Sequence, residues 1–277
     1  MTKIKFFKTI LLFSVITIFF LQSNIAEAKE IKIQPQTVTY ATDLQADIFK
    51  IPIKKIVPAV ILIHGGYWSA GNRSELSDFA TKLAQNGFLA MTIDYHLLPK
   101  YSQTKQTEDI TNAIWWLREN NEELGINSSK IGVVGLSSGG YLAAWAATHD
   151  RVNSKGTHSI PNAVVSLYGP WDLTNSGISK VPESNQLVEQ FCAGQDREAV
   201  SPLYVISYPM PPVLLIHGDA DKIVPVSQSI NAYNKLKSLH CKCKLIIVHN
   251  DGHCFPNTPS YFNAMNHSVK FLNKVLK

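Results

Sequence analysis

The chain has 277 residues, of which 45% are hydrophobic and 17% charged, and its formal net charge is +5 at pH 7. These proportions are those of an ordinary globular protein and exclude a disordered or fibrous chain. The charge is mild, the longest basic run is Lys54-Lys55, and no basic stripe alternates with aromatic residues. We therefore expect no nucleic-acid partner.

The first 28 residues have the layout of a secretory signal peptide. A lysine-rich start precedes an almost wholly apolar stretch at residues 10–21, and Ala26 and Ala28 are small residues at the spacing that a signal peptidase recognises. We expect cleavage after Ala28 and export to the periplasm or the extracellular space. An uncleaved membrane anchor is the alternative, but the apolar stretch is shorter than the roughly 20 residues that a bilayer requires. We therefore expect no stable membrane insertion of the mature chain.

Strand-like and helix-like stretches alternate along the rest of the sequence. Weak alternation over residues 31–49 predicts an antiparallel edge hairpin. Apolar, β-branched runs then predict strands at residues 57–63, 88–93, 130–134, 163–168, 213–216 and 244–248. Helical spacing predicts helices at residues 109–124, 139–148, 227–239 and 261–276. Fully apolar strands that alternate with helices predict an α/β fold, with a mostly parallel sheet covered on both faces.

One long segment, residues 172–201, has no clear periodicity. It contains Gly, Pro, Ser and Asn, with a short apolar run at residues 187–192. We interpret it as a small cap segment over the sheet edge that shapes a substrate pocket. The sequence has no internal repeat, so we expect residues 29–277 to form a single domain.

A candidate nucleophile lies in the segment Gly135–Gly139, which fits the pattern G-x-S-x-G. The segment follows a predicted strand and precedes a predicted helix, which is the setting of a nucleophile elbow. Such a turn strains the serine backbone and exposes the hydroxyl above the sheet. Ser138 is the rival, but only Ser137 has glycine two positions away on both sides. The simpler alternative is a glycine-rich turn that merely begins a helix.

A serine nucleophile requires a base within hydrogen-bond reach and a carboxylate that orients the base. In the nucleophile-elbow fold these residues follow in the order Ser, acid, His. Asp219 and Asp221 both follow the predicted strand 213–216, and the residues alone leave the choice between them open. His253 follows a flexible Asn-Asp-Gly loop that can place an imidazole over the serine. His249, at a strand end, and His267, inside the last helix, are poorer candidates for the base.

A possible oxyanion hole follows the strand at residues 57–63. The segment His64–Trp68 reads HGGYW, and two glycines let a loop turn its amides inward. Preorganised backbone N–H groups stabilise the oxyanion of acyl transfer. We expect the donors to be Gly66, Tyr67 and Ser138. An ordinary Gly-Gly turn would explain the loop if it stood alone.

Two tryptophans are candidates for substrate contact. Trp68 lies in the glycine-rich loop and Trp171 directly precedes the cap segment. Tyr67 and Phe255 lie near the same loops. Aromatic residues in such places serve as often for packing, so this assignment is open.

Four cysteines remain after removal of the signal segment: Cys192, Cys241, Cys243 and Cys254. An even number in an exported protein permits disulfides, but the sequence does not give their connectivity. Cys241 and Cys243 share one strand face, which is a poor geometry for a bond between them. A zinc site that combined these two with the downstream histidines would lack paired C-x-x-C spacing. We expect no metal and no organic cofactor.

Together these motifs resemble the esterases and lipases of the α/β-hydrolase superfamily, in the branch of bacterial acetyl-xylan/feruloyl esterases and kynurenine formamidases. The resemblance runs from about Val57 to the C-terminus. His64–Trp68 resembles the H-G-G-x-W oxyanion loop, and residues 252–255 resemble G-H-G-F with a cysteine in place of the second glycine. Residues 94–97 resemble D-Y-R-L with His96 in place of arginine. We expect that replacement to remove a buried ion pair.

The resemblance also selects the acid. In the family the acid is the third residue after the glycine of the H-G pair, which is Asp221 here. The resemblance thus implies an α/β-hydrolase fold, a triad of Ser137, Asp221 and His253, and hydrolysis of small-molecule carboxylic esters with small or medium acyl groups. It leaves the natural substrate and the oligomeric state open.

Two alternatives to an esterase remain. An amide hydrolase, similar to N-formylkynurenine formamidases or to peptidases, would use the same residues. A non-catalytic binding protein on the same scaffold is less favoured, because such proteins typically lose a triad residue.

Overall fold

Eight strands form one sheet in the computed structural model, which describes residues 33–52, 55–174, 182–207, 209–253 and 258–277. The proposed signal segment lies outside the described residues, as do Cys254 and Phe255. Residues 33–277 form one compact unit. No helix of the described residues is both long and apolar enough to cross a membrane.

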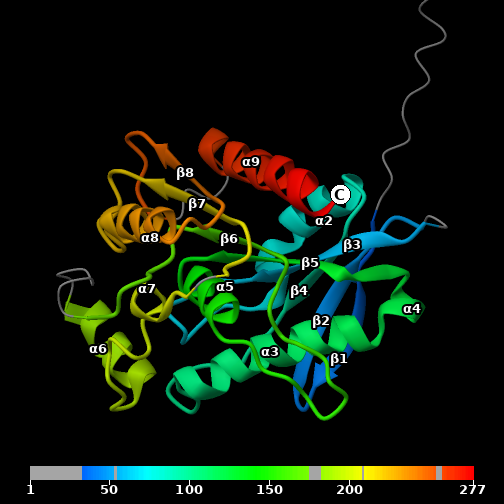
Figure 1. Ribbon diagram of the computed structural model, residues 1–277, viewed down its shortest axis with the longest axis horizontal. Helices are drawn as coiled ribbons and strands as arrows, with labels where there is room; N and C mark the ends of the chain where they lie inside the picture. Colours follow the sequence, from blue (N-terminus) through cyan, green and yellow to red (C-terminus); the bar gives the residue numbers. More distant parts are fainter. Residues whose placement is uncertain (1–32, 53–54, 175–181, 208, 254–257) are drawn as a thin grey trace, which may run out of the picture. The chain divides into compact units, whose positions relative to one another are not determined.

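The strands lie in the order β1-β2-β4-β3-β5-β6-β7-β8 (Figure 1). At one edge β1 (Gln36–Ala41) and β2 (Leu44–Phe49) form an antiparallel hairpin, and β2 also runs antiparallel to β4 (Leu89–Ile93). All the other neighbours are parallel: β4, β3 (Val57–Ile63), β5 (Ile126–Leu136), β6 (Ala163–Leu167), β7 (Val213–Gly218) and β8 (Cys243–Val248). The predicted edge hairpin and the mostly parallel sheet are thus confirmed.

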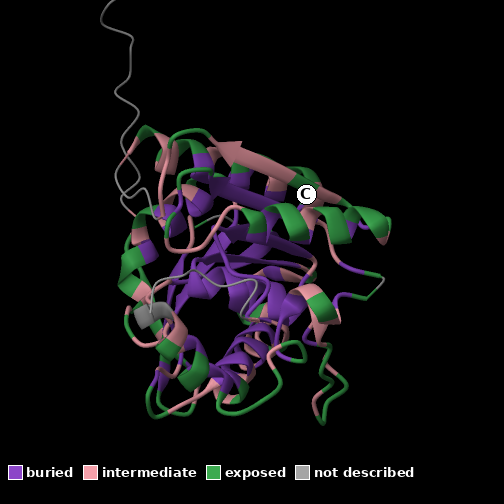
Figure 2. Ribbon diagram, turned by 90° about the vertical axis from the view of Figure 1, so that its left-hand side faces the viewer, coloured by how far each residue is buried: buried purple, intermediate pink, exposed green. Residues whose placement is uncertain are grey.

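Helices cover both faces of this sheet because the side chains of each strand alternate between two hydrophobic clusters. Ile61 and Ile63 of β3 pack in one cluster, Val60 and Leu62 in the other. The first cluster contains residues of α3 (Gln103–Glu119), α5 (Ser138–Thr148) and α8 (Ser227–Ser238). The second contains residues of α2 (Ser77–Gln85) and α9 (Pro259–Leu276). Figure 2 shows the buried residues concentrated in the sheet and on the helices against it.

The structure corrects the boundaries of the helix predicted at residues 109–124. Helix α3 begins six residues earlier, and a second short helix, α4 (Asn121–Leu124), follows it. The first turns of α3 were missed because they bury polar residues, among them Gln103 and Gln106, which show no apolar spacing. Gly125, with φ 60°, ends α4 in the left-handed conformation that favours glycine.

The predicted cap segment contains a regular element that its sequence did not reveal. Helix α6 (Pro182–Cys192) includes the short apolar run, and its Val188 and Phe191 side chains are buried. The short helices η1 (Arg73–Leu76) and α7 (Pro202–Val205) complete the described helices. The Phe191 ring stacks on the Trp68 ring at 4.2 Å between centroids, so α6 packs directly on the glycine-rich loop.

Candidate active site

Ser137 lies at a sharp turn between β5 and α5, with φ 53° and ψ −120°. Its flanking glycines are required by close backbone approaches. A Cβ on Gly135 would lie 1.9 Å from the Gly139 carbonyl oxygen, and a Cβ on Gly139 would lie 2.3 Å from the Ile63 carbonyl oxygen. The Ser137 N–H donates to the Leu167 carbonyl at 2.9 Å, which ties the strained turn to β6. These contacts explain why the turn needs glycine at both positions.

The imidazole of His253 bridges the serine and the carboxylate of Asp221. Ser137 Oγ lies 2.8 Å from His253 Nε2, and His253 Nδ1 lies 2.7 Å from Asp221 Oδ2. A carboxylate oxygen can only accept, so Nδ1 carries the imidazole proton and Nε2 accepts from the serine hydroxyl. The three residues follow β5, β7 and β8, whose carboxyl ends meet at one edge of the sheet.

Asp221 is almost fully buried and all its hydrogen bonds favour the ionised form. Its Oδ1 accepts from the N–H groups of Ile223 and Val224, both at 2.9 Å. Burial by itself would raise the pKa of Asp221, but hydrogen bonds from His217 and His253 outweigh it and hold the pKa well below its usual range. The carboxylate therefore remains charged at neutral pH.

His217 is a site residue that the sequence reasoning missed. Its fully buried Nε2 lies 2.8 Å from the Val224 carbonyl and 3.2 Å from Asp221 Oδ2. Both are acceptors, so Nε2 carries the proton. Its Nδ1 lies 2.7 Å from Ser229 Oγ, which can donate to it. The available signal was a histidine in the otherwise apolar β7, where a buried polar side chain requires a partner.

The rival candidates for acid and base contact each other instead of the serine. Asp219 Oδ2 lies 2.7 Å from His249 Nδ1, and Asp219 Oδ1 accepts from the Asn250 N–H at 2.7 Å. His267 is exposed on α9. The structure thus brings Asp221 and His253, and neither Asp219 nor His249, to Ser137.

The glycine-rich loop lies against the serine. A Cβ built on Gly65 would be 3.2 Å from the Ser137 Cβ. Gly66, Tyr67 and Trp68 have positive φ angles of 112°, 53° and 60°. Positive φ is uncommon for residues other than glycine, and here two such residues adopt it in succession. A Cβ on Gly66 would lie 2.1 Å from the Ala70 carbonyl oxygen, so this position also requires glycine.

The expected oxyanion donors lie at this junction of loop and helix. Ser138 follows the serine as the first residue of α5, and Gly66 lies in the loop beside it. Within the described ranges, the N–H groups of Gly66 and Ser138 have no backbone acceptor. Neither N–H group is therefore used in a turn or loop hydrogen bond to the backbone of the described residues.

Buried side chains fix the conformation of this loop. The His64 ring stacks on the Tyr95 ring at 4.4 Å. The Trp68 carbonyl accepts from the Leu98 N–H at 2.8 Å and from Gln106 Nε2 at 3.0 Å. The loop is thus held from two neighbouring segments, the stretch that follows β4 and helix α3.

The two tryptophans expected to contact substrate are core residues in the structure. Trp68 is 3% exposed and Trp171 is fully buried. Trp68 packs on Phe191, and Trp171 Nε1 donates to Ser166 Oγ at 3.3 Å. Neither indole faces an open surface, so the structure assigns both to packing.

The structure shows what takes the place of the expected arginine ion pair at His96. The His96 N–H and Nδ1 lie 2.9 and 2.8 Å from Asp109 Oδ2, so histidine keeps a buried partner where the family has arginine. Burial raises the pKa of Asp109, and the hydrogen bonds from His96 offset that rise only in part.

The described cysteines are free thiols. Cys192 and Cys241 are buried and Cys243 is half-buried, and none of the three forms a disulfide. Burial raises the pKa of the Cys192 thiol to about 11, which keeps it protonated. No group of three or more His, Cys, Asp or Glu side chains within the described ranges could hold a metal ion.

Comparison with known proteins places this geometry in a family. The BD-FAE family profile matches residues 47–236. Esterase LipC of Mycobacterium tuberculosis is 28% identical over 200 residues, which are 67% of this chain and 49% of LipC. The chain spans about half the length of the curated relatives it matches.

A solved esterase has the same fold. Thermogutta terrifontis esterase 2, phosphonylated by sarin, superposes with a TM-score of 0.79 at 24% identity, over 87% of this chain and 95% of that chain. The same enzyme with butyrate bound superposes with a TM-score of 0.76 at 25% identity, over 87% and 94%. The chain therefore belongs to the BD-FAE family and has the α/β-hydrolase fold.

Proposed function

We propose that the protein is a serine hydrolase that cleaves carboxylic esters of small or medium acyl groups through an acyl-enzyme intermediate. The observation that supports this most strongly is the continuous line of contacts from Ser137 Oγ to His253 Nε2 at 2.8 Å and from His253 Nδ1 to Asp221 Oδ2 at 2.7 Å. A serine hydroxyl is a weak nucleophile by itself, and this arrangement is what activates it.

In the first step Ser137 Oγ attacks the ester carbonyl carbon while His253 Nε2 takes the hydroxyl proton. Asp221 stabilises the imidazolium that forms. The negative charge on the former carbonyl oxygen is placed against the N–H groups of Gly66, Tyr67 and Ser138. Each such donor typically contributes about 3–4 kcal/mol to transition-state stabilisation.

In the rest of the reaction His253 acts first as an acid and then again as a base. His253 gives its proton to the leaving alcohol oxygen, and the ester bond to that alcohol breaks. A water molecule then loses a proton to His253 and attacks the acyl group on Ser137. Release of the carboxylic acid restores the free hydroxyl. Each step uses side chains of this chain and water, so the proposal needs no cofactor.

The choice of an ester over an amide rests on the relatives. LipC is described as an esterase, and the Thermogutta enzyme is an esterase with butyrate, a short acyl group, in one of its structures. The same triad could cleave an amide, and no feature of the described residues favours that reaction.

The direct test is the substitution Ser137→Ala, measured with p-nitrophenyl acetate. We expect kcat to fall by about 10⁴-fold or more, because the nucleophile is lost. The matched control is Ser129→Ala, which makes the same change at an exposed position of the same strand and should retain full activity. Equal activity of Ser137→Ala and the wild type would refute the proposal.

A further inference from the structure

Charge is distributed unevenly along the chain. Residues 222–277 contain eight lysines and a single carboxylate side chain, Asp251, whereas the preceding 221 residues contain 18 basic and 20 acidic side chains. The elements of that last part are α8, β8 and α9. The excess of positive charge therefore gathers at the β8 edge of the sheet.

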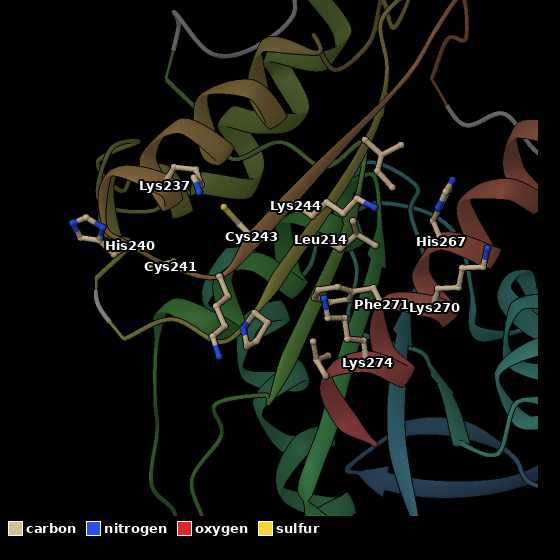
Figure 3. Close-up of a pocket in the computed structure, with 14 residues that line it drawn as sticks. Leu214, Lys237, His240, Cys241, Cys243, Lys244, His267, Lys270, Phe271 and Lys274 are labelled. Atoms are coloured by element: carbon tan, nitrogen blue, oxygen red, sulfur yellow. The ribbon is translucent and has the colours of Figure 1, made fainter.

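These elements enclose a groove of about 640 Å³ with lysines along its length (Figure 3). Its five exposed lysines come from all three elements and the loop before β8: Lys237, Lys242, Lys244, Lys270 and Lys274. Figure 3 shows Lys237 on one side of Lys244 and Lys270 on the other. No aspartate or glutamate is among the described residues that line the groove.

The floor of the groove is partly apolar, and the lysine side chains that line the groove are all positively charged. Ile246, Phe271 and Val275 line it and are half-buried. Burial lowers the pKa of His267 at the rim, and the positive charges of Lys244 and Lys270 lower it further. Lys244 and Lys270 thus lower the pKa of a neighbouring basic side chain, and no carboxylate in the described lining offsets their positive charge.

Protection of the sheet edge explains only part of this pattern. Lysines on an edge strand prevent pairing with another chain, and β8 is an edge strand. That role accounts for Lys242 and Lys244. It does not account for Lys237 on α8 or for Lys270 and Lys274 on α9. A second copy of the chain is also a poor occupant, because its own lysines would face these.

We propose that the groove binds a linear polysaccharide that carries carboxylate groups. A chain of regularly spaced negative charges matches lysines that line the groove from several elements. The half-buried ring of Phe271 offers an apolar surface to the C–H face of a sugar. Lysine carries a point charge and lacks the bidentate geometry of arginine. Such a charge suits repeated contacts with carboxylates along a polymer.

Two other negatively charged partners, an anionic lipid bilayer and single-stranded nucleic acid, fit the groove less well. A lipid bilayer is flat, and the large exposed hydrophobic residues that could enter it, such as Tyr204 and Phe262, are outside the groove lining. Single-stranded nucleic acid is usually bound by aromatic side chains on which successive bases stack. Phe271 is the one Phe, Tyr or Trp among the described lining residues.

The groove is separate from the candidate active site, so this proposal goes beyond the proposed function. Lys242 precedes β8 and His253 follows it, and six residues of strand span roughly 20 Å. Binding is therefore measurable without catalysis, and the Ser137→Ala protein should bind as the wild type does. Failure of ester hydrolysis and failure of binding are then distinct results.

The test measures binding of the protein to sodium polygalacturonate by titration calorimetry at about 50 mM salt. We expect binding that weakens steeply with salt, and no binding to uncharged hydroxyethylcellulose. The double variant Lys244→Gln/Lys270→Gln should bind about tenfold more weakly, because it loses two charge contacts with the polymer. The matched control, Lys82→Gln/Lys100→Gln, removes the same charge outside the groove and should bind within about twofold of the wild type.

Three results would overturn the proposal. One is no measurable binding of polygalacturonate, and another is an equal loss of affinity in both double variants. The third is tighter binding to single-stranded DNA or to phosphatidylglycerol vesicles than to polygalacturonate. Thermal unfolding of each variant confirms that it remains folded in the assay.

Discussion

His217 does not touch Ser137, but it contacts Asp221, the acid of the proposed triad. It donates to Asp221 Oδ2 at 3.2 Å, on the same oxygen that faces His253. Two donors on one oxygen hold the carboxylate in place and favour its ionised form. Because His217 is itself fixed by Ser229, the orientation of Asp221 depends on a buried chain of hydrogen bonds.

The substitution His217→Leu tests this role. We expect kcat/KM to fall by about 10-fold to 100-fold, because a hydrogen bond to a charged group contributes about 1.5–3 kcal/mol. We also expect the pKa of Asp221 to rise. A lowered pKa in the folded state stabilises the fold above the unfolded pKa of about 3.9, and that stability is lost as pH falls through the folded value. The variant should therefore lose less stability than the wild type on acidification.

His217→Gln serves as the control, since its amide can restore an N–H donor. It should recover part of the lost activity, whereas a purely steric role would make both variants equally poor. Activity in His217→Leu equal to the wild type would show that Asp221 needs no such support.

At the scale of elements, helix α6 connects the cap segment to the oxyanion loop. Phe191 on α6 stacks on Trp68 and packs edge-to-face on Tyr141 of α5, at 5.2 Å between centroids. Trp68 directly follows Tyr67, whose N–H we assign to the oxyanion hole. The position of that donor therefore depends on a ring contributed by another part of the chain.

The substitution Phe191→Ala should loosen this contact. We expect about 3–5 kcal/mol of lost stability from the cavity, and a fall in kcat larger than the change in KM, because the oxyanion forms only after binding. Phe191→Leu fills most of the space and should lose less of both. Kinetics on p-nitrophenyl acetate together with urea unfolding separate the two effects. An unchanged kcat in a destabilised Phe191→Ala would limit α6 to a structural role.

At the scale of the whole molecule, the sequence predicted the sheet well because its pattern is local. Apolar, β-branched runs identify strands such as β3 and β7, whose side chains are all buried. The strand–turn–helix around Ser137 was predictable for the same reason. The polar first turns of α3 and the helix α6 were not, because tertiary contacts rather than local periodicity bury their residues.

The sequence identified those residues of the candidate site that chain order and motif spacing indicate. It did not identify the features that depend on how distant side chains pack. Order along the chain indicated Ser137 and His253, and family spacing indicated Asp221. The burial of Trp68 and the contact of His217 with Asp221 depend on side chains that are distant in sequence. Export remains a prediction from residues 1–28, and N-terminal sequencing of the secreted protein would test it.

The most direct test of the central claim is labelling with a fluorophosphonate, followed by mass spectrometry of the peptides. If Ser137 is activated as proposed, it will attack phosphorus and keep the phosphonyl group. Thermogutta terrifontis esterase 2, which has the same fold, is phosphonylated by sarin. We predict one stoichiometric adduct, on Ser137, that fails to form in His253→Ala. An unlabelled protein, or an adduct at any other residue, would contradict the account.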